Sequence, residues 1–219
     1  KMVDVLGLQS AVALDISNSV FLEIVPDAVE SYGSMPTTSV RAYDLFTRAN
    51  SIHRSEAISE EAYQRQRDLL EAAVAEDPNF ADAWARLNQH LDEMARTIVQ
   101  QRWFGSTAEE RDAYLAETRT AAAHALERAV ALAPESVPTL LAIGADAIAE
   151  MGDLAFKTGR REYLERAVAL EPENAWVLYT YGWWLWDMGE LEKATEMIKH
   201  ALDRKSTRLN SSHQIISYA

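Results

Sequence analysis

The sequence predicts an all-α protein built as an array of antiparallel helix pairs. The first observation is a motif that recurs three times, as AVAEDP from Ala73, AVALAP from Ala129 and AVALEP from Ala167. The second is that apolar residues recur at spacings of three and four, which is the period of a helix. The third is that no alternating apolar and polar run is long enough to predict a strand. Each motif ends in proline and so predicts the end of one helix before the next begins.

The spacing of the motif predicts repeats of unequal length. The first alanines are separated by 129 − 73 = 56 residues and then by 167 − 129 = 38 residues. A weaker fourth copy, ALDRKS, starts at Ala201, which is 201 − 167 = 34 residues later. A period of 34 residues is typical of one family of helix-hairpin repeats. The longer intervals predict insertions, and we expect the largest near residues 98–108.

Composition limits the classes of function. The chain has 219 residues, of which 48% are apolar and 25% charged, as in ordinary globular proteins. Its formal net charge of −13 argues against nucleic-acid binding by this module, because phosphate binding needs clustered Lys and Arg. No apolar run approaches the roughly 20 residues of a membrane-spanning helix, so we expect no direct membrane contact. The absence of cysteine excludes disulfides and thiolate metal sites.

The first helices follow from their apolar stripes and caps. Ser59 is a predicted N-cap, and Pro78 ends the helix that it starts. The apolar stripe of that helix is Tyr63, Leu69, Leu70, Ala73 and Val74. A second amphipathic helix over residues 80–100 carries Trp84, Leu87, Leu91 and Met94. We expect these two helices to fold back on each other as one hairpin.

The later helices are bounded by caps and glycines. Thr107 and Glu110 have the spacing of a capping box, which predicts a long helix ending near Leu132, after a turn at Gly105. A further pair over residues 137–157 and 160–170 is expected to meet at Gly159. The last pair, over residues 174–188 and 190–204, is expected to meet at Gly189.

The last pair resembles a tetratricopeptide repeat. In AWVLYTYGWWLWDMGELEKATEMIKHAL, Gly182 stands at the helix contact and Gly189 at the turn. Ala194, Ile198 and Ala201 follow along the second helix. The resemblance implies a right-handed superhelical solenoid that binds peptides or partner helices on its concave face. Earlier units depart from the family pattern, because Gln66, Asn88 and Arg160 stand where the family has small residues.

A narrower resemblance covers most of the chain. The ordered segments DVLGLQSAVALDI, MPTTSVRAYDLFTRA and EDPNFADAWARL are similar to the repeat region of bacterial membrane-anchored winged-helix transcriptional activators and class III adenylate cyclases. The resemblance implies that residues 1–38 are a trailing helix of a preceding domain plus a linker, and that residues 39–204 are the repeat array. It also implies a bacterial regulatory module on the cytoplasmic or periplasmic side of an anchored parent. Because the chain starts at Lys1, we expect it to be a fragment.

The expected function is a non-catalytic protein-interaction or signal-relay module whose partner is a protein or peptide. Two alternatives remain open at this stage. One is the regulatory region of a class III adenylate cyclase or another enzyme, and the other is a free-standing peptide-binding adaptor.

Residues 205–219 break the repeat. The order of apolar residues stops, and Ser206 to Gln214 is mostly polar. The segment resembles a string that recurs at the ends of unrelated proteins translated from metagenomic assemblies. We expect a non-native or disordered tail without function.

Motifs for catalysis, metals and cofactors are missing from the sequence. No nucleophile elbow, phosphate-binding glycine loop or His-Glu-x-x-His motif is present. His90 and Glu93 have the spacing of a metal-ligand pair, but a di-metal bundle needs two such motifs, so we expect them to be surface polar residues. The sequence therefore predicts no enzyme, no metal site and no cofactor.

An aromatic stripe provides the candidate binding site. Trp176, Tyr179, Trp183 and Trp186 follow one another at offsets of three, seven and ten, and therefore share one face of a helix. Leu178, Tyr181, Gly182 and Leu185 share another face. The tetratricopeptide resemblance implies that the second set packs and the first lines a peptide groove, with a polar wall of Asp82, Gln89, Asp92 and Glu93 from an earlier repeat. Packing of the aromatic stripe between repeats is the open alternative.

Overall fold

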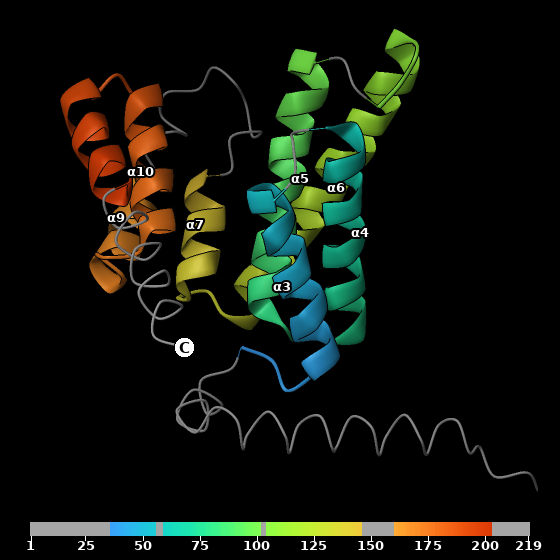
Figure 1. Cartoon of the computed structure of the whole chain (residues 1–219), viewed down its shortest axis with the longest axis horizontal. Coiled ribbons are helices and arrows are strands. Elements are labelled where there is room, and N and C mark those ends of the chain that lie inside the picture. The colour runs from blue at the N-terminus through green and yellow to red at the C-terminus, as the bar shows by residue number, and fades with distance from the viewer. Residues whose placement is uncertain (1–35, 56–58, 102–103, 146–159, 203–219) are drawn as a thin grey trace, which may run out of the picture. The chain divides into compact units, whose positions relative to one another are not determined.

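The computed structural model describes residues 36–55, 59–101, 104–145 and 160–202, and all regular structure in these ranges is helical. The helices are α3 (Val40–Ser55), α4 (Glu60–Glu76), α5 (Ala81–Gln101), α6 (Ala108–Leu132), α7 (Val137–Ala145), α9 (Arg161–Leu170) and α10 (Ala175–Asp187), followed by a helix over residues 191–202 (Figure 1). The predicted all-α fold is confirmed. The trailing helix expected within residues 1–38 precedes the described residues, and the turn at Gly159 and the tail at 205–219 also lie outside them.

The helix starts follow the caps read from the sequence. Ser59 Oγ accepts a hydrogen bond from Ala62 N at 3.2 Å, which caps α4. Thr107 and Glu110 form the complete capping box at the start of α6, with Glu110 N donating to Thr107 Oγ1 at 3.1 Å and Thr107 N donating to Glu110 Oε2 at 3.1 Å. These bonds satisfy amide groups that have no partner within the helix. Both predicted caps are confirmed.

The recurring motif ends the second helix of each of three pairs in the same way. Ala73, Ala129 and Ala167 are fully buried near the ends of α4, α6 and α9. The carbonyl of each alanine accepts a hydrogen bond from the backbone N–H four residues later, at 3.1, 2.9 and 3.0 Å respectively. A small side chain at this place lets the next helix approach closely, and the proline that follows cannot extend the helix. The repeat in sequence is therefore a repeat in structure.

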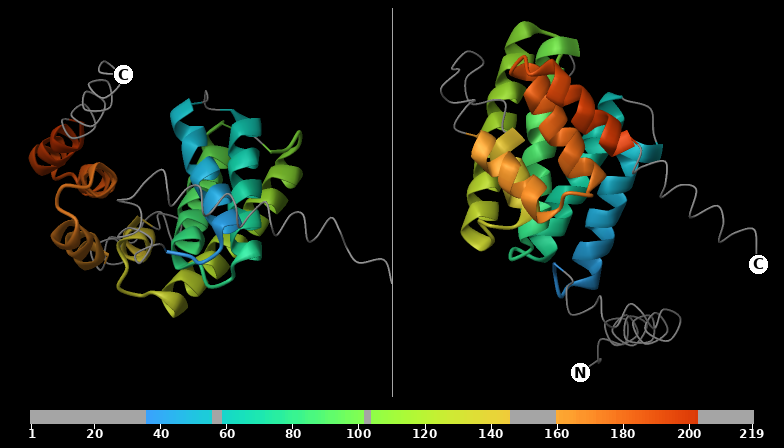
Figure 2. Two further views of the ribbon diagram at one scale, coloured as in Figure 1. Left: turned by 60° about the horizontal axis from the view of Figure 1, so that its bottom comes forward. Right: turned by 90° about the vertical axis from the view of Figure 1, so that its left-hand side faces the viewer.

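The main partner of α5 differs from the one expected from the sequence. The helix over residues 80–100 was expected to form its hairpin with the preceding helix, and α4 and α5 do pack together. However, α5 packs more extensively against α6, and α3 is the partner of α4. The pairs are thus α3 with α4, α5 with α6, α7 with α9, and α10 with the helix over 191–202, which is the arrangement expected when the motif closes each pair (Figures 1 and 2). The stripe of α5 is apolar toward both neighbours, so the sequence alone left its main partner undecided.

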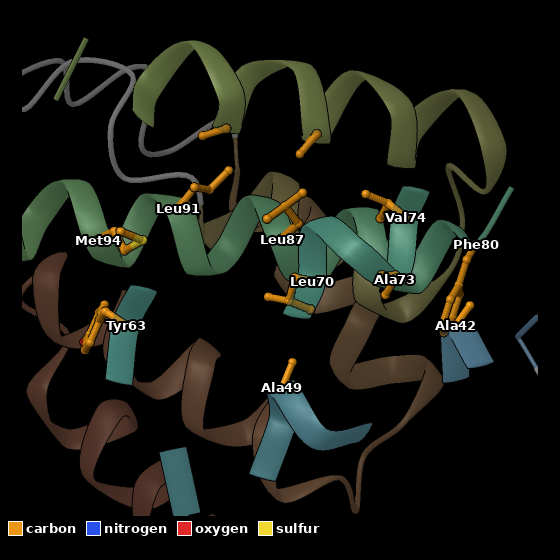
Figure 3. Packing of buried hydrophobic residues seen from close by; sticks show 13 residues of the cluster. Ala42, Ala49, Tyr63, Leu70, Ala73, Val74, Phe80, Leu87, Leu91 and Met94 are labelled. Carbon is orange, nitrogen blue, oxygen red and sulfur yellow. The ribbon is translucent and has the colours of Figure 1, made fainter. Parts of the chain in front are cut away.

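Two larger apolar cores hold the array. The first lies between α3, α4, α5 and α6 and includes Leu70, Phe80, Leu87, Leu91 and Met94 (Figure 3). The second joins α7, α9, α10 and the helix over 191–202 through Leu140, Leu164, Val177, Leu185 and Ala194. A small cluster of Ala85, Ala129 and Ala142 connects α5, α6 and α7.

In the first half of the array, two of the three residues that depart from the family pattern have buried side chains. Gln66 and Asn88 are each 1% exposed. Asn88 Nδ2 donates a hydrogen bond to Ala122 O at 3.0 Å and so ties α5 to α6. Asn88, which stands where the family has a small residue, therefore forms a hydrogen bond to the neighbouring helix α6.

The segment between α5 and α6 is attached through an aromatic residue. Phe104 adopts a left-handed backbone with φ of 61°, whereas Gly105, where we expected the turn, has no positive φ. The Phe104 ring stacks on Tyr114 of α6 with centroids 4.9 Å apart, and Phe104 N donates to Glu60 Oε1 of α4 at 3.1 Å. Gly105 is needed for space, because a Cβ there would lie 2.8 Å from Arg111 Cγ. An insertion near 98–108 remains a prediction, but α5 and α6 are 21 and 25 residues long and make this repeat the longest.

Candidate interaction surface on helix α10

Helix α10 presents two chemically similar faces to different surroundings. Val177, Leu178, Tyr181 and Leu185 are at most 9% exposed, and Val177, Tyr181 and Leu185 pack into the second core. Trp176, Tyr179, Trp183 and Trp186 are 46%, 39%, 48% and 52% exposed. We call these four residues the aromatic face. Asn174 starts the helix by accepting hydrogen bonds from Trp176 N and Val177 N at 2.9 and 3.4 Å.

The rings of the aromatic face contact one another in sequence order. Trp176 stacks on Tyr179 with centroids 5.8 Å apart, Tyr179 meets Trp183 edge to face at 6.1 Å, and Trp183 lies 6.4 Å from Trp186. These separations are within the range of favourable aromatic pairs. The four side chains therefore form one continuous apolar strip along the helix.

The opposite side of α10 is fixed by packing and polar contacts. A Cβ at Gly182 would lie 2.7 Å from Ile198 Cγ1, so the glycine permits the close approach of the helix over 191–202 (Figure 2). Tyr181 donates to Glu165 Oε1 of α9 at 3.1 Å. Arg161 of α9 lies over the Trp184 ring at 5.8 Å and contacts Glu190 Oε1 at 2.7 Å. These contacts set the rotation of α10 about its axis and thereby hold the aromatic face outward.

Arg86 of α5 contacts the edge of the aromatic face. Its guanidinium carbon lies 5.5 Å from the centre of the Trp176 ring, and its Nε donates to Asn50 Oδ1 of α3 at 2.9 Å. Arg86 therefore joins side chains of α3, α5 and α10. Burial lowers the pKa of Arg86, and the charge of Glu93 opposes that change. Sequence analysis did not select Arg86, although it lies four residues after Asp82 and three before Gln89 on the same side of α5.

Asp82 lies near a second carboxylate. Burial and the repulsion of Glu171 raise the pKa of Asp82 from its ordinary value. Glu171 follows α9 directly and accepts a hydrogen bond from Asn174, the residue that caps α10. The charges of two acidic groups from distant repeats therefore influence each other, and one of them lies just before the cap of α10. Sequence analysis missed Glu171 because it lies in the recurring motif, which was interpreted as a helix end.

The other residues of the expected polar wall have different surroundings. Gln89 Nε2 donates to Pro138 O at 3.5 Å, which links α5 to α7. Glu93 accepts a hydrogen bond from the Tyr63 hydroxyl at 2.8 Å, which links α5 to α4. Asp92 is only 3% exposed, so its side chain offers little surface to a partner. A continuous wall of these four residues remains a prediction, and Asp82 is the member affected by the charge of Glu171, which lies just before α10.

His90 corrects another expectation. It was expected to be a surface polar residue, but it is fully buried between α4 and α5. Its Nε2 lies 2.9 Å from Tyr63 O, and its ring lies 5.4 Å from the Tyr63 ring. The helical period of α5 places His90 beside Leu87, Leu91 and Met94, and that position outweighs its polarity. Within the described residues there is no group of three or more side chains that could hold a metal ion.

The chain is weakly similar to some solved structures of known proteins. No protein-family model and no curated protein matches the chain. Among solved structures, "MamA MSR-1 C2" is 14% identical with a TM-score of 0.36, and the match covers 73% of this chain and 74% of that one. "Crystal structure of MamA" is 15% identical with a TM-score of 0.33, covering 69% of this chain and 93% of that one. The all-α array of helix pairs is established by the packing described above. None of the helices in the described ranges is long and apolar enough to span a bilayer.

Proposed function

We propose that this chain is a non-catalytic interaction module that binds a peptide or a partner helix on the aromatic face of α10. One observation carries the proposal. Four large aromatic side chains, each between 39% and 52% exposed, form a continuous strip on one side of a helix whose other side is buried. Contiguous exposed apolar strips are uncommon on monomeric proteins and mark interaction sites.

Aromatic residues suit this role for an energetic reason. Trp and Tyr supply a large contact area while losing little rotational freedom, because each has only two side-chain torsions. Here neighbouring rings already hold one another through stacked and edge-to-face contacts. The entropy lost on binding is therefore smaller than for flexible side chains. Trp and Tyr are also the residues that most often dominate the free energy of protein interfaces.

The setting that the resemblance suggests is a bacterial regulatory protein in which this array relays or docks a signal. The net charge of −13 supports a protein partner over a nucleic acid. The segments similar to transcriptional activators and adenylate cyclases support a regulatory parent of one of these two kinds.

The test is peptide selection followed by measurement of affinity. Peptides selected from a displayed random library on the whole chain are titrated by calorimetry against the chain and its Trp183→Ala and Trp186→Ala variants. Loss of one anchor should weaken binding by about 1–4 kcal/mol, which is roughly 5-fold to 1,000-fold in Kd. Val130→Ala on α6 is the control, because Val130 is also exposed, at 37%, but lies on another helix.

Circular dichroism separates binding from folding in the same variants. We expect both tryptophan variants to retain their helicity and melting temperature, since the two side chains are about half exposed. Unfolding of the last repeat with unchanged affinity for the selected peptides would show that the aromatic face is packing surface. Trp183→Leu and Trp186→Leu keep an apolar side chain and provide a second measurement if the alanine variants lose structure.

A further inference from the structure

The aromatic face has carboxylates at both of its ends. Helix α10 contains no Lys or Arg, and its one charged residue is Asp187. Asp187 is exposed and lies eleven residues after Trp176, which is three helical turns and the same side of the helix. At the other end, Asp82 lies one turn before Arg86, whose guanidinium contacts Trp176, and the charge of Glu171 raises the pKa of Asp82. The apolar strip is thus flanked by negative charge on each side.

The carboxylates near the strip are not neutralised by the described part of the chain. Neither Asp82 nor Asp187 forms an ion pair with a described residue. Asp82 is only partly exposed, so it has lost some of its hydration without gaining a cation. Repulsion between Asp82 and Glu171 adds to this cost. A partner that places a positive charge beside Asp82 would offset both its lost hydration and its repulsion by Glu171.

One contact within the chain shows that a guanidinium fits this surface. Arg86 lies over the Trp176 ring at 5.5 Å. That distance is within the range of cation–π attraction, which is strongest for tryptophan. The rings of Tyr179, Trp183 and Trp186 continue the same strip and are exposed. These three rings can make the same cation–π contact with a cation that another protein supplies.

We propose that the occupant of the aromatic face is an arginine-bearing amphipathic segment of another protein, with apolar residues on the tryptophans and arginines at the two acidic ends. This rests on the proposed function and adds the chemistry of the partner. The distance from Trp176 to Trp186 is ten residues, or about 15 Å along the helix. Arginine suits both ends, because its flat guanidinium stacks on indole rings and pairs with carboxylates at the same time.

The experiment uses the whole chain and three synthetic peptides of roughly 18 residues, about five helical turns. The peptides share one leucine stripe, and their polar positions are all Arg, all Lys or all Glu. We expect the Arg peptide to bind most tightly, the Lys peptide more weakly and the Glu peptide not measurably. Binding of the Arg peptide should weaken with added salt, because the flanking carboxylates are exposed or partly exposed. Equal affinity of the Arg and Glu peptides, or no binding by any of them, would overturn the proposal.

Matched variants locate the interaction. Trp183→Leu keeps the apolar contact and removes the π-system, and it should weaken the Arg peptide by roughly 2-fold to 30-fold. Asp82→Asn and Asp187→Asn should each weaken the Arg peptide and leave a neutral Gln version of the peptide unchanged. Glu109→Gln at the start of α6 is the charge control, because it is exposed on another helix. An effect of Glu109→Gln as large as that of Asp82→Asn would show attraction to the overall charge and contradict the proposed site.

The outcomes separate this inference from the proposed function. If all peptides bind equally and Trp183→Ala weakens all of them, the aromatic face is an interaction site and only the preference for arginine is wrong. The other possible occupant is the chain's own end, since Arg204, Lys205 and Arg208 follow the last described helix in the sequence. Binding that emerges only after these three residues are changed to glutamine would assign the face to the chain itself and overturn a partner in trans.

Discussion

Tyr63 shows how one residue can join helices in this array. Its ring is buried in the first core beside His90, and its hydroxyl donates to Glu93 at 2.8 Å. Burial, followed by the charge of Glu93, raises the pKa of Tyr63 from 10.0 to about 12. A raised pKa in the folded state means that the neutral hydroxyl stabilises the fold. That stabilisation is complete below pH 10 and is lost as the pH rises through about 12.

Tyr63→Phe tests this directly. The variant loses a hydrogen bond to a charged group, so near neutral pH its free energy of unfolding should fall by about 1–2 kcal/mol. As the pH rises from 10 toward 12, the difference between the two proteins should shrink, because only the tyrosine form has an ionisation that opposes folding. Urea unfolding followed by circular dichroism at stepped pH measures both effects. Tyr179→Phe, an exposed tyrosine, is the control, and a constant difference across the pH range would contradict the assignment.

At the scale of elements, helix contacts depend on where the chain places its smallest residues. Gly144 of α7 faces Leu164 of α9, and a Cβ at Gly144 would lie 2.4 Å from Leu164 Cγ. Gly182 of α10 has a similar relation to Ile198. Ridges of one helix enter grooves of the next, and glycine deepens the groove at these two places. The glycine at each contact therefore allows the two helices of a pair to approach.

Gly144→Ala should destabilise the chain even though alanine favours a helix by about 1 kcal/mol. Crowding against Leu164 should cost about 1–3 kcal/mol, and the net effect should be a lower melting temperature. Leu164→Ala relieves the crowding, so the double variant should be more stable than the sum of the two single changes predicts. Thermal unfolding of the four proteins measures this coupling. If the effects of the two single changes on stability were strictly additive, Gly144 and Leu164 would not be in close contact.

The local sequence was sufficient to predict where α4 and α6 begin. Ser59 and Thr107 bond to backbone amides within one turn, so their roles depend only on nearby residues. The pairing of α5 with α6 and the burial of His90 were not predictable in this way. Both depend on which neighbour covers a given side of α5, and the apolar stripe of α5 is wide enough to contact two helices.

At the scale of the whole molecule, the array has two larger cores joined by a smaller cluster. The first core lies in α3 to α6 and the second in α7 to the helix over 191–202. Between them is a cluster whose buried members are Ala85, Ala129 and Ala142, which have little apolar surface. Repeat arrays of this kind are stabilised by contacts between neighbours, so parts of them can unfold separately.

Leu164→Ala and Leu70→Ala should therefore unfold different halves first. Each leucine is fully buried, one in each core, and each change should cost about 2–5 kcal/mol. Four of the six tryptophans lie in α10, so tryptophan fluorescence reports mainly on the second core, whereas circular dichroism reports on all helices. With Leu164→Ala, the fluorescence transition should precede the circular dichroism transition in urea. With Leu70→Ala, the order should reverse, and coincident transitions in both variants would indicate one cooperative unit.

The sequence by itself determined the all-α class, the repeat and the two predicted caps, because helical period, proline stops and capping side chains act over a few residues. It also grouped the four aromatic residues on one side of α10, since that follows from their spacing alone.

Only the tertiary structure decided which side of α10 is covered. Both sides are rich in aromatic and apolar residues, so the pattern does not distinguish packing from exposure. Gly182 and Tyr181 settle the rotation of the helix through their contacts with the helix over 191–202 and with α9. The contact of Arg86 with Trp176 and the effect of the Glu171 charge on Asp82 join residues about ninety positions apart, and both exist only once the repeats have packed.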